Sequence, residues 1–209
     1  MTNALSYVHR FVPASDAAQP TTLLLLHGTG GNASDLLSLG AELLPGAALL
    51  SPQGDVLESG MPRFFRRLAE GVFDIPNLKA KTHQLADFVQ AAAQEYRFDA
   101  QKVIAVGFSN GANIAACLLL LRPEILAGAV LLRPMIPLVP ETLPDLSNVP
   151  VLLAAGTHDP IVSIDETERL EALLNKAGAI VTAHYQQSGH SLTQGDIHTA
   201  KVFLQASLL

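Results

Sequence analysis

Short, wholly aliphatic segments recur along this chain and constrain its fold more than any other feature. Two of them, Leu23–Leu26 and Val103–Val106, contain no polar residue. A strand with one face in water alternates polar and apolar side chains, so a continuous apolar run indicates a strand that is buried on both faces. Strands of that kind belong to parallel sheets with helices packed on either side. The chain is therefore predicted to be an α/β protein.

Segments with helical spacing separate these runs. The clearest is Leu78–Tyr96, in which apolar side chains recur every three or four residues. Ser163, with Glu166 three residues later, has the spacing of a capping box at the start of another helix. The expected strands are Tyr7–Val12, Thr21–Leu26, Ala47–Leu50, Val103–Val106, Ala129–Leu132, Val151–Ala155 and Ala179–Tyr185, and the expected helices are Ser34–Leu44, Leu78–Tyr96, Ala112–Leu121, Ser163–Lys176 and Asp196–Leu209. This alternation predicts a mostly parallel, doubly covered sheet in a single domain at residues 1–209.

Composition and charge exclude several classes of protein. The chain has 13 Lys and Arg against 19 Asp and Glu, a net charge of −6, which leaves no broad basic surface for nucleic acid. Its aliphatic runs are far shorter than the ~20 residues that cross a bilayer, so we expect no membrane span. Met1–Arg10 lacks the pattern of a signal peptide, and a single cysteine, Cys117, excludes an internal disulfide. These features favour a cytoplasmic protein.

A candidate nucleophile follows the central aliphatic run. Gly107–Gly111 reads Gly-Phe-Ser-Asn-Gly and lies between the strand Val103–Val106 and a helix. This is the G-x-S-x-G nucleophile elbow in its expected setting of strand, sharp turn and helix. The turn lifts the serine hydroxyl above the sheet, and bulky neighbours would collide with adjacent backbone. We therefore predict Ser109 as a catalytic nucleophile.

A serine hydroxyl needs an adjacent base, which a carboxylate in turn orients. With this elbow the expected chain order is Ser, then Asp or Glu, then His. Asp159 and His190 follow the last two expected strands in that order, so both should lie at the carboxyl edge of the sheet with Ser109. The competing Asp165 is expected in the first turn of a helix, where the helix dipole accounts for it. His184 and His198 are expected inside a strand and a helix, respectively, and in structural roles.

Acyl transfer also requires hydrogen-bond donors that face the developing oxyanion. One expected donor is the backbone N–H of Asn110, directly after the nucleophile. The other is predicted in the glycine-rich turn after Leu26, and the Thr29 N–H is the candidate there. We expect His27 to pack and hydrogen-bond beneath this turn rather than to act in catalysis.

Two other readings of the same residues have to be considered. Gly28–Ala33 also fits G-x-G-x-x-A after a strand, the fingerprint of dinucleotide binding in NAD-dependent oxidoreductases. That fingerprint requires an acidic residue at the end of the next strand, where this chain has Ser51-Pro52-Gln53. The second alternative is a hydrolase-fold binding protein without activity, which would usually lack a member of the triad. Here Ser109, Asp159 and His190 are all present.

With these residues identified, the chain resembles the small α/β-hydrolases of the phospholipase/carboxylesterase (acyl-protein thioesterase-like) family. The likeness covers essentially the whole chain and runs through four motifs, His27–Gly30, Gly107–Gly111, Gly156–Val162 and Gly189–His190. Ser51–Gly54 followed by Arg63–Arg67 resembles a bacterial subgroup of small serine esterases that includes hydrolases associated with quinone and aromatic-compound stress.

The resemblance implies the α/β-hydrolase fold, with Ser109, Asp159 and His190 as the triad and Thr29 and Asn110 as oxyanion-hole donors. Two positions depart from the family pattern. Asn110 stands where members commonly have Gln, and Gly31-Asn32 stand where an acidic residue is common. Both departures bear on specificity for acyl-protein or phospholipid substrates.

The expected reaction is hydrolysis of small carboxylic esters, with thioesterase or lysophospholipase activity on the same triad as an alternative. A chain of this size leaves no room for a large lid domain, so an open cleft for short, medium or aryl acyl groups is expected. Residues of the two long irregular stretches Pro52–Asn77 and Arg133–Pro150 could wall it, namely Phe64, Phe65, Met135, Ile136 and Leu138.

Four further points complete the expectations. The cluster Arg63, Arg66 and Arg67 could attract an anionic leaving group, but ordinary solvated arginines are the expectation. Cys117 lies eight residues after Ser109 and is expected to be buried and unreactive. No metal-ligand spacing is present, and serine hydrolysis requires no cofactor. The sequence leaves open whether an exposed apolar helix face supports a homodimer.

Overall fold

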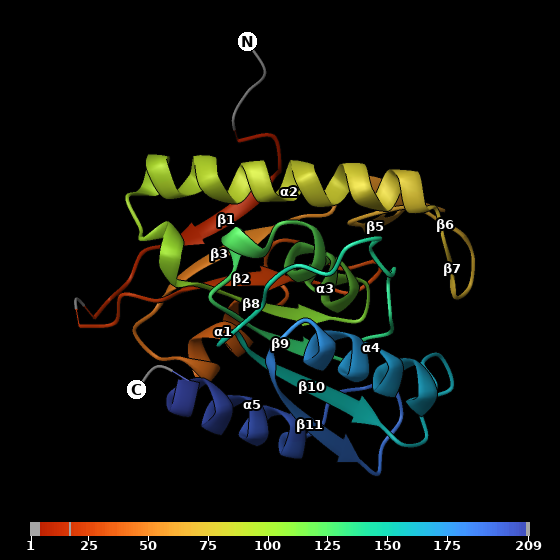
Figure 1. Ribbon diagram of the computed structural model, residues 1–209. Helices are drawn as coiled ribbons and strands as arrows, with labels where there is room; N and C mark the ends of the chain where they lie inside the picture. Colours follow the sequence, from red (N-terminus) through yellow and green to blue (C-terminus); the bar gives the residue numbers. More distant parts are fainter. Residues whose placement is uncertain (1–4, 17, 208–209) are drawn as a thin grey trace.

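The computed structural model describes residues 5–16 and 18–207, and its centre is a seven-stranded sheet (Figure 1). The strands lie in the order β1-β3-β2-β8-β9-β10-β11. Their bounds are β1 His9–Val12, β2 Thr22–Leu26, β3 Ala48–Pro52, β8 Val103–Phe108, β9 Gly128–Leu132, β10 Pro150–Gly156 and β11 Ile180–Gln186. Only β1 in this sheet runs antiparallel to its neighbour, β3. The prediction of a mostly parallel sheet is confirmed.

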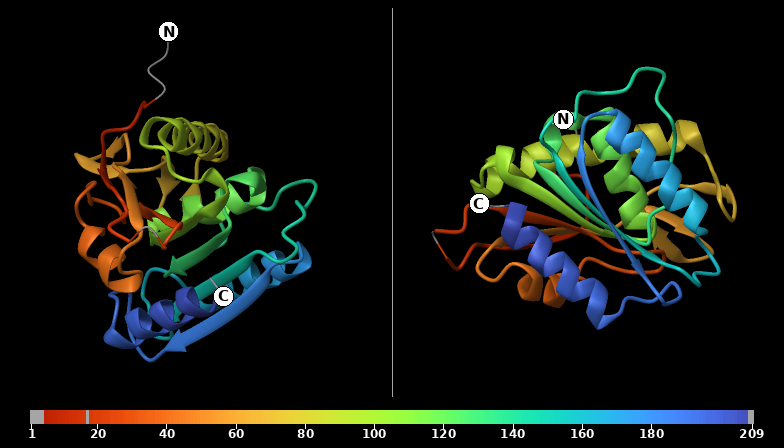
Figure 2. Two further views of the ribbon diagram at one scale, coloured as in Figure 1. Left: turned by 90° about the vertical axis from the view of Figure 1, so that its left-hand side faces the viewer. Right: turned by 60° about the horizontal axis from the view of Figure 1, so that its bottom comes forward.

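Within the described residues five α-helices pack against the sheet, and Figure 2 shows helices on both of its faces. They are α1 Leu37–Leu43, α2 Ile75–Tyr96, α3 Asn110–Leu121, α4 Ile164–Lys176 and α5 Gln194–Ser207. Apolar residues of α2, α3 and α4 form one core with one face of the sheet, while those of α1 and α5 form a second core on the other face. β2, β8 and β9 are buried between the two cores. Their continuous apolar sequences follow from this double coverage.

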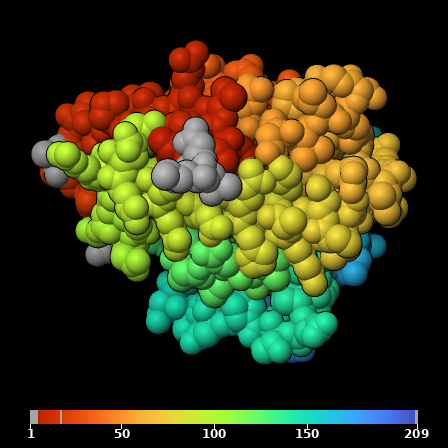
Figure 3. Space-filling view, turned by 90° about the horizontal axis from the view of Figure 1, so that it is seen from above, coloured from red at the N-terminus to blue at the C-terminus, as the bar shows by residue number. Residues whose placement is uncertain are grey.

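The segment before α2 differs most from the expectation. Two small hairpins lie within the stretch expected to be irregular, and their strands are β4 Val56–Glu58, β5 Met61–Arg63, β6 Arg67–Ala69 and β7 Val72–Phe73. Strands of two or three residues are too short to show an alternating pattern, so the sequence did not reveal them. Figure 3 shows this segment, in orange and yellow, against one end of α2. We call residues 53–74 the hairpin segment.

Four of the five described α-helices begin at other residues than expected, and the largest differences are at α1 and α2. α1 begins at Leu37, because Asn32 and Asp35 form a turn in which the Asn32 N–H donates to the Asp35 carboxylate. α2 begins before Leu78, with the Asp74 side chain accepting from the Asn77 N–H at its N-terminus. Ser163 is the N-cap of α4 as expected, but its side chain makes no capping hydrogen bond. The last two residues of the expected C-terminal helix lie outside the described residues.

Two further expectations from the sequence were a long irregular stretch after residue 132 and the absence of a membrane-spanning helix. Residues 133–149 contain no helix or strand, as expected, and lead from β9 to β10. None of the described helices is both long and apolar enough to cross a membrane.

Candidate active site

Ser109 lies in a strained turn between β8 and α3. Its φ of 52° and ψ of −112° are unusual for a residue with a side chain. A Cβ atom at Gly107 would lie 2.5 Å from the Gly111 carbonyl oxygen, and one at Gly111 would lie 1.9 Å from the Leu26 carbonyl oxygen. Both glycines of the motif are therefore required by the close approach of backbone, as the elbow predicts.

The structure brings the three expected side chains into one hydrogen-bonded line. The Ser109 Oγ lies 2.9 Å from the His190 Nε2, and the His190 Nδ1 lies 2.7 Å from the Asp159 Oδ2. The Asp159 carboxylate is 1% exposed, and its other oxygen accepts the N–H groups of Ile161 and Val162. A carboxylate held from both sides in this way fixes the orientation of the imidazole.

Contacts between the two loops after β10 and β11 explain why Asp159 and His190 meet. The Thr157 N–H donates to the Gln186 carbonyl, and the His158 N–H donates to the Ser188 carbonyl. A Cβ at Gly156 would lie 2.3 Å from the Gly189 oxygen, so this approach needs a glycine. The competing Asp165 lies in the first turn of α4, as expected.

A buried arginine holds the loop that carries His190. Arg133, directly after β9, is 1% exposed and forms an ion pair with the buried carboxylate of Asp196 at 2.7 Å. Its guanidinium also donates to the Gly189 carbonyl at 3.1 Å, the Ser188 hydroxyl at 3.1 Å and the Ser191 carbonyl at 3.0 Å. These acceptors flank His190 on both sides along the chain, so we call Arg133 and Asp196 the loop clamp.

Hydrogen bonds in the clamp determine how Asp196 titrates. Burial alone would raise the pKa of its carboxyl, but the hydrogen bonds from Arg133 and Thr193 outweigh burial and hold that pKa below its usual range. Our sequence reasoning missed both members of the clamp. The available signal was an arginine directly after a buried strand, at the edge where the other site residues lie.

The two expected oxyanion donors face the same cavity as Ser109. Thr29 and Asn110 both line it, and neither backbone N–H has a hydrogen-bond partner within the described part of the chain. The Asn110 side chain makes a separate contact. Its Oδ1 accepts the Phe64 N–H at 2.8 Å, and this hydrogen bond connects the hairpin segment to the nucleophile elbow. This leaves the backbone donor of Asn110 free.

His27 lies beneath the glycine-rich turn, as expected. It is 2% exposed, and its Nε2 accepts the Gly54 N–H at 2.9 Å. Burial lowers the pKa of its imidazole, which favours the neutral form that this contact requires. The turn leads into α1 only at Leu37, whereas a dinucleotide fingerprint opens a helix directly after its glycines.

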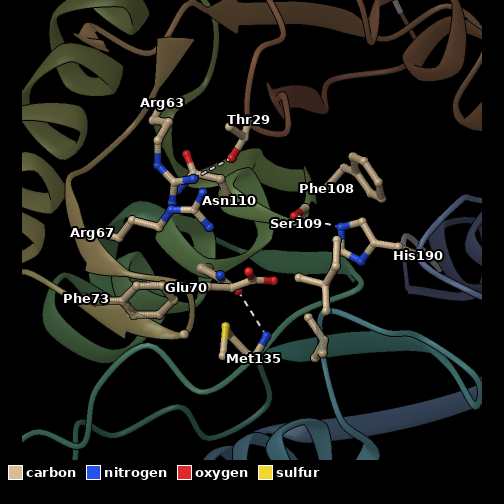
Figure 4. A pocket seen from close by; sticks show the side chains of 14 residues that line it. Thr29, Arg63, Arg67, Glu70, Phe73, Phe108, Ser109, Asn110, Met135 and His190 are labelled. Carbon is tan, nitrogen blue, oxygen red and sulfur yellow. Dashed lines mark hydrogen bonds between the residues drawn. The ribbon is translucent and has the colours of Figure 1, made fainter. Parts of the chain in front are cut away.

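The cavity above Ser109 has a volume of about 320 Å³ (Figure 4). Its apolar wall consists of Phe73, Phe108, Met135, Ile161 and Val162, and its charged or polar lining includes Thr29, Arg63, Arg67, Glu70, Asn113 and His190. The Asn113 Oδ1 accepts the Met135 N–H at 3.0 Å and so positions part of the apolar wall. The volume suits small ligands.

Four of the five residues expected in the pocket wall do not line this cavity. Met135 does. Phe64 and Phe65 are fully buried in the core, Leu138 is 8% exposed there, and Ile136 packs against the same core. The physical reason is that large apolar loop residues gain more from complete burial than from a place on an open wall. Apolar side chains missed in the sequence, above all Phe73, line the cavity instead.

The three arginines of the hairpin segment separate into two kinds. Arg63 and Arg67 line the cavity, and the Arg63 Nη1 donates to the Thr29 hydroxyl at 2.6 Å. Arg66 points elsewhere, because its side chain is 62% exposed and pairs with Asp74 at 2.7 Å. Sequence reasoning favoured solvated arginines, which holds for Arg66 but not for the buried Arg63.

Cys117 is fully buried in α3, and burial raises the pKa of its thiol, so it is not a second nucleophile. No group of three or more His, Cys, Asp or Glu side chains within residues 5–16 and 18–207 is placed to hold a metal ion.

The sheet order, the elbow and the position of the site at the carboxyl edge of the strands define the α/β-hydrolase class. Within that class the chain belongs to the phospholipase/carboxylesterase family, whose model matches residues 8–208.

Relatives of known class agree with this assignment. The chain is 48% identical to MhqD of Bacillus subtilis (strain 168), named as a hydrolase, over 90% of this chain and 94% of the relative. It superposes on a Bacillus cereus carboxylesterase with a TM-score of 0.93 at 48% identity, over 96% and 94% of the two chains. A Mesorhizobium loti carboxylesterase gives a TM-score of 0.89 at 30% identity, over 98% and 97%. The chain is a hydrolase of the carboxylesterase type.

Proposed function

We propose that this protein is a serine carboxylesterase that cleaves short- to medium-chain or aryl carboxylic esters. The hydrogen-bonded line from Asp159 through His190 to Ser109 is the observation that carries the proposal. Its three members have separate roles in acyl transfer: Ser109 is the nucleophile, His190 is the general base and acid, and Asp159 orients the imidazole.

In the first step the Ser109 Oγ attacks the ester carbonyl carbon while the His190 Nε2 takes the hydroxyl proton. Asp159 keeps the imidazole in the tautomer that presents an acceptor to the serine, because its Oδ2 lies 2.7 Å from Nδ1. The N–H groups of Thr29 and Asn110 stabilise the oxyanion. His190 then protonates the departing alcohol, which leaves an acyl-enzyme.

In the second step a water molecule loses a proton to His190 and attacks the acyl carbon. The Ser109–acyl bond breaks, the serine oxygen regains a proton from His190, and the carboxylic acid leaves. No oxidant or reductant takes part.

The direct test is the substitution Ser109→Ala. We expect kcat for p-nitrophenyl butyrate to fall by about three to six orders of magnitude, with little change in the midpoint of urea unfolding. A serine-directed fluorophosphonate should label the native protein at Ser109 and leave the variant unlabelled. Unchanged turnover in Ser109→Ala, or labelling elsewhere, would overturn the assignment.

The rate of ester hydrolysis should also fall as the pH is lowered. The base must be neutral to accept the serine proton, so kcat/KM should fall once the solution is acidic enough to protonate it. We would follow p-nitrophenyl butyrate hydrolysis between neutral and acidic pH in buffers of constant ionic strength. A rate that stays flat across this range would exclude His190 as the base.

A panel of p-nitrophenyl and naphthyl esters of graded acyl length, run beside a thioester, defines the substrate class. We expect short and medium acyl esters to react fastest, because the cavity holds only about 320 Å³. A higher kcat/KM for the thioester than for its oxygen ester would favour a thioesterase on the same triad.

A further inference from the structure

Two guanidinium groups share one carboxylate beside the cavity. The Arg63 Nε lies 3.3 Å from the Glu58 Oε2, and the Arg67 Nη2 lies 2.7 Å from the Glu58 Oε1. The hydrogen bond from Arg67 holds the pKa of Glu58 below its usual range, so this carboxylate is ionised at neutral pH. The group formed by Arg63, Arg67 and Glu58 therefore has a net charge of +1.

Both arginines retain donors that could bind a ligand. The Arg63 Nε donates to the Phe65 carbonyl and its Nη1 to the Thr29 hydroxyl, while the Arg67 Nε donates to Glu58. Among the described residues, the Arg63 Nη2 and the Arg67 Nη1 donate to no group. In Figure 4 the Arg67 guanidinium points into the cavity. An unpaired guanidinium donor in a partly desolvated site favours an anionic acceptor.

The position of the arginines indicates which part of an ester they would meet. In the proposed reaction the leaving oxygen must lie beside His190, which protonates it, and the carbonyl oxygen must face the Thr29 and Asn110 N–H groups. The acyl chain is the remaining substituent and has to point away from the imidazole. Figure 4 shows Arg63 and Arg67 on the opposite side of Ser109 from His190. The arginines therefore lie on the acyl side.

We propose that Arg63 and Arg67 form a subsite for an anionic group at the far end of the acyl chain, so that half-esters of dicarboxylic acids are preferred substrates. This inference rests on the proposed esterase function. The carboxylate would accept from the free guanidinium donors, while the methylene chain would lie along the apolar wall at Met135 and Phe73. Sequence reasoning favoured solvated arginines and left an anionic leaving group as the alternative.

Glu70 is the one acidic side chain that lines the cavity within the described residues, and it opposes such a ligand. It is exposed and forms no ion pair with either arginine. Solvent therefore screens its charge more than that of the buried Arg63. Its effect is measurable, because removing this charge should strengthen the binding of an anionic acyl group.

The experiment compares matched esters that differ in one charge. Mono-p-nitrophenyl adipate, pimelate and suberate are each measured beside their methyl-capped, neutral counterparts, with spontaneous hydrolysis subtracted. A second pair places the charge on the other side, as 3-carboxy-4-nitrophenyl butyrate beside 4-nitrophenyl butyrate. We expect kcat/KM for at least one half-ester to exceed that of its capped form by about tenfold or more, and to fall with added salt. The charged leaving group should gain no such advantage.

Substitutions test whether the preference for half-esters comes from this subsite. Arg67→Gln should reduce the ratio of charged to capped ester at least tenfold, whereas Glu70→Gln should increase it. Arg66→Gln is the matched control, because it removes the same charge from a neighbouring residue that does not line the cavity. Its ratio should equal that of the wild type.

Each outcome bears on one proposal. Hydrolysis of capped esters without any preference for half-esters overturns the anionic subsite and leaves the esterase function intact. Preference for the charged leaving group, or equal loss of the ratio in Arg66→Gln and Arg67→Gln, also overturns it. Failure to hydrolyse any ester of the set, together with absent labelling at Ser109, overturns the proposed function itself.

Discussion

Backbone atoms around Ser109 leave no room for side chains at the neighbouring glycines. The Cβ positions at Gly107 and Gly111 fall 2.5 Å and 1.9 Å from carbonyl oxygens, distances that real Cβ atoms do not show. Ser109 itself adopts a positive φ, which costs free energy in a residue with a side chain. The Ser109 hydroxyl is thus held in place by steric constraints on neighbouring residues that have no part in the proposed reaction.

This argument predicts very different effects of adding a methyl group at two glycines. Gly111→Ala should lower the free energy of unfolding by more than about 3 kcal/mol or prevent folding, because its Cβ would overlap the Leu26 carbonyl. Gly60→Ala is the comparison, since Gly60 has a φ of 82° but nothing within 4 Å of its Cβ position. It should cost about 1–2 kcal/mol, the backbone strain alone. Urea unfolding of both variants measures the difference, and equal costs would contradict the steric argument.

At the scale of elements, the ends of β8, β10 and β11 supply the three side chains of the proposed triad, and the loop clamp after β9 holds the loop of one of them, His190. Arg133 donates to three acceptors in the loop of His190 while its charge is balanced by Asp196. Neither residue touches Ser109, so their effect on activity has to pass through the position of the imidazole. A misplacement of about 1 Å can lower a rate a hundredfold.

Replacing the clamp separates its structural role from its positioning role. Arg133→Met leaves the Asp196 charge buried and should cost about 3–5 kcal/mol of stability. Arg133→Met/Asp196→Asn removes both charges, keeps an oxygen for Thr193, and should recover much of that loss. We expect kcat to stay about tenfold to a hundredfold low in both variants with KM little changed.

The readouts are urea unfolding and p-nitrophenyl butyrate kinetics, with Arg133→Lys as the conservative variant. If kcat returned to the wild-type value together with stability in the double variant, the clamp would be structural only. Arg122→Met, which breaks a surface pair with Asp87 at the other end of α3, serves as the control that should leave kcat unchanged.

For the whole molecule, ion pairs link the segments that build the site. Glu58 joins the two arginines of the hairpin segment, and Asp196 joins α5 to the end of β9. Both carboxyl groups have pKa values below their usual range in the folded protein, Glu58 through its hydrogen bond from Arg67 and Asp196 because its hydrogen bonds outweigh burial. Their contribution to stability therefore depends on pH.

The sign of this dependence follows from the lowered pKa values. In the unfolded chain these carboxyl groups bind protons at a higher pH, so the stabilisation is complete above about pH 5 and is lost as the pH falls through the folded-state values. We expect the urea midpoint to fall between pH 6 and about pH 3, and to fall less steeply in Glu58→Gln. Glu141→Gln, at an exposed position, should follow the wild type. A midpoint that rises toward acid would contradict the argument.

Local sequence was informative wherever a short pattern is tied to one geometry. The aliphatic runs predicted the buried strands, and the strand-end rule selected Asp159 and His190 over Asp165 and His184. These predictions needed no knowledge of distant contacts, because both faces of such a strand must be covered and the carboxyl ends of parallel strands share one edge. The assembled geometry of these residues supports the catalytic roles that we propose for them.

Only the tertiary structure decided which side chains surround Ser109. Phe64 and Phe65 entered the core, Phe73 took a place on the cavity wall, and Arg63, Arg66 and Arg67 separated into two cavity residues and one solvated residue. Loop side chains follow no periodic rule, and their directions depend on packing against segments far away in sequence. For the same reason the role of Arg133 could not be predicted, because its partner Asp196 lies 63 residues further along the chain.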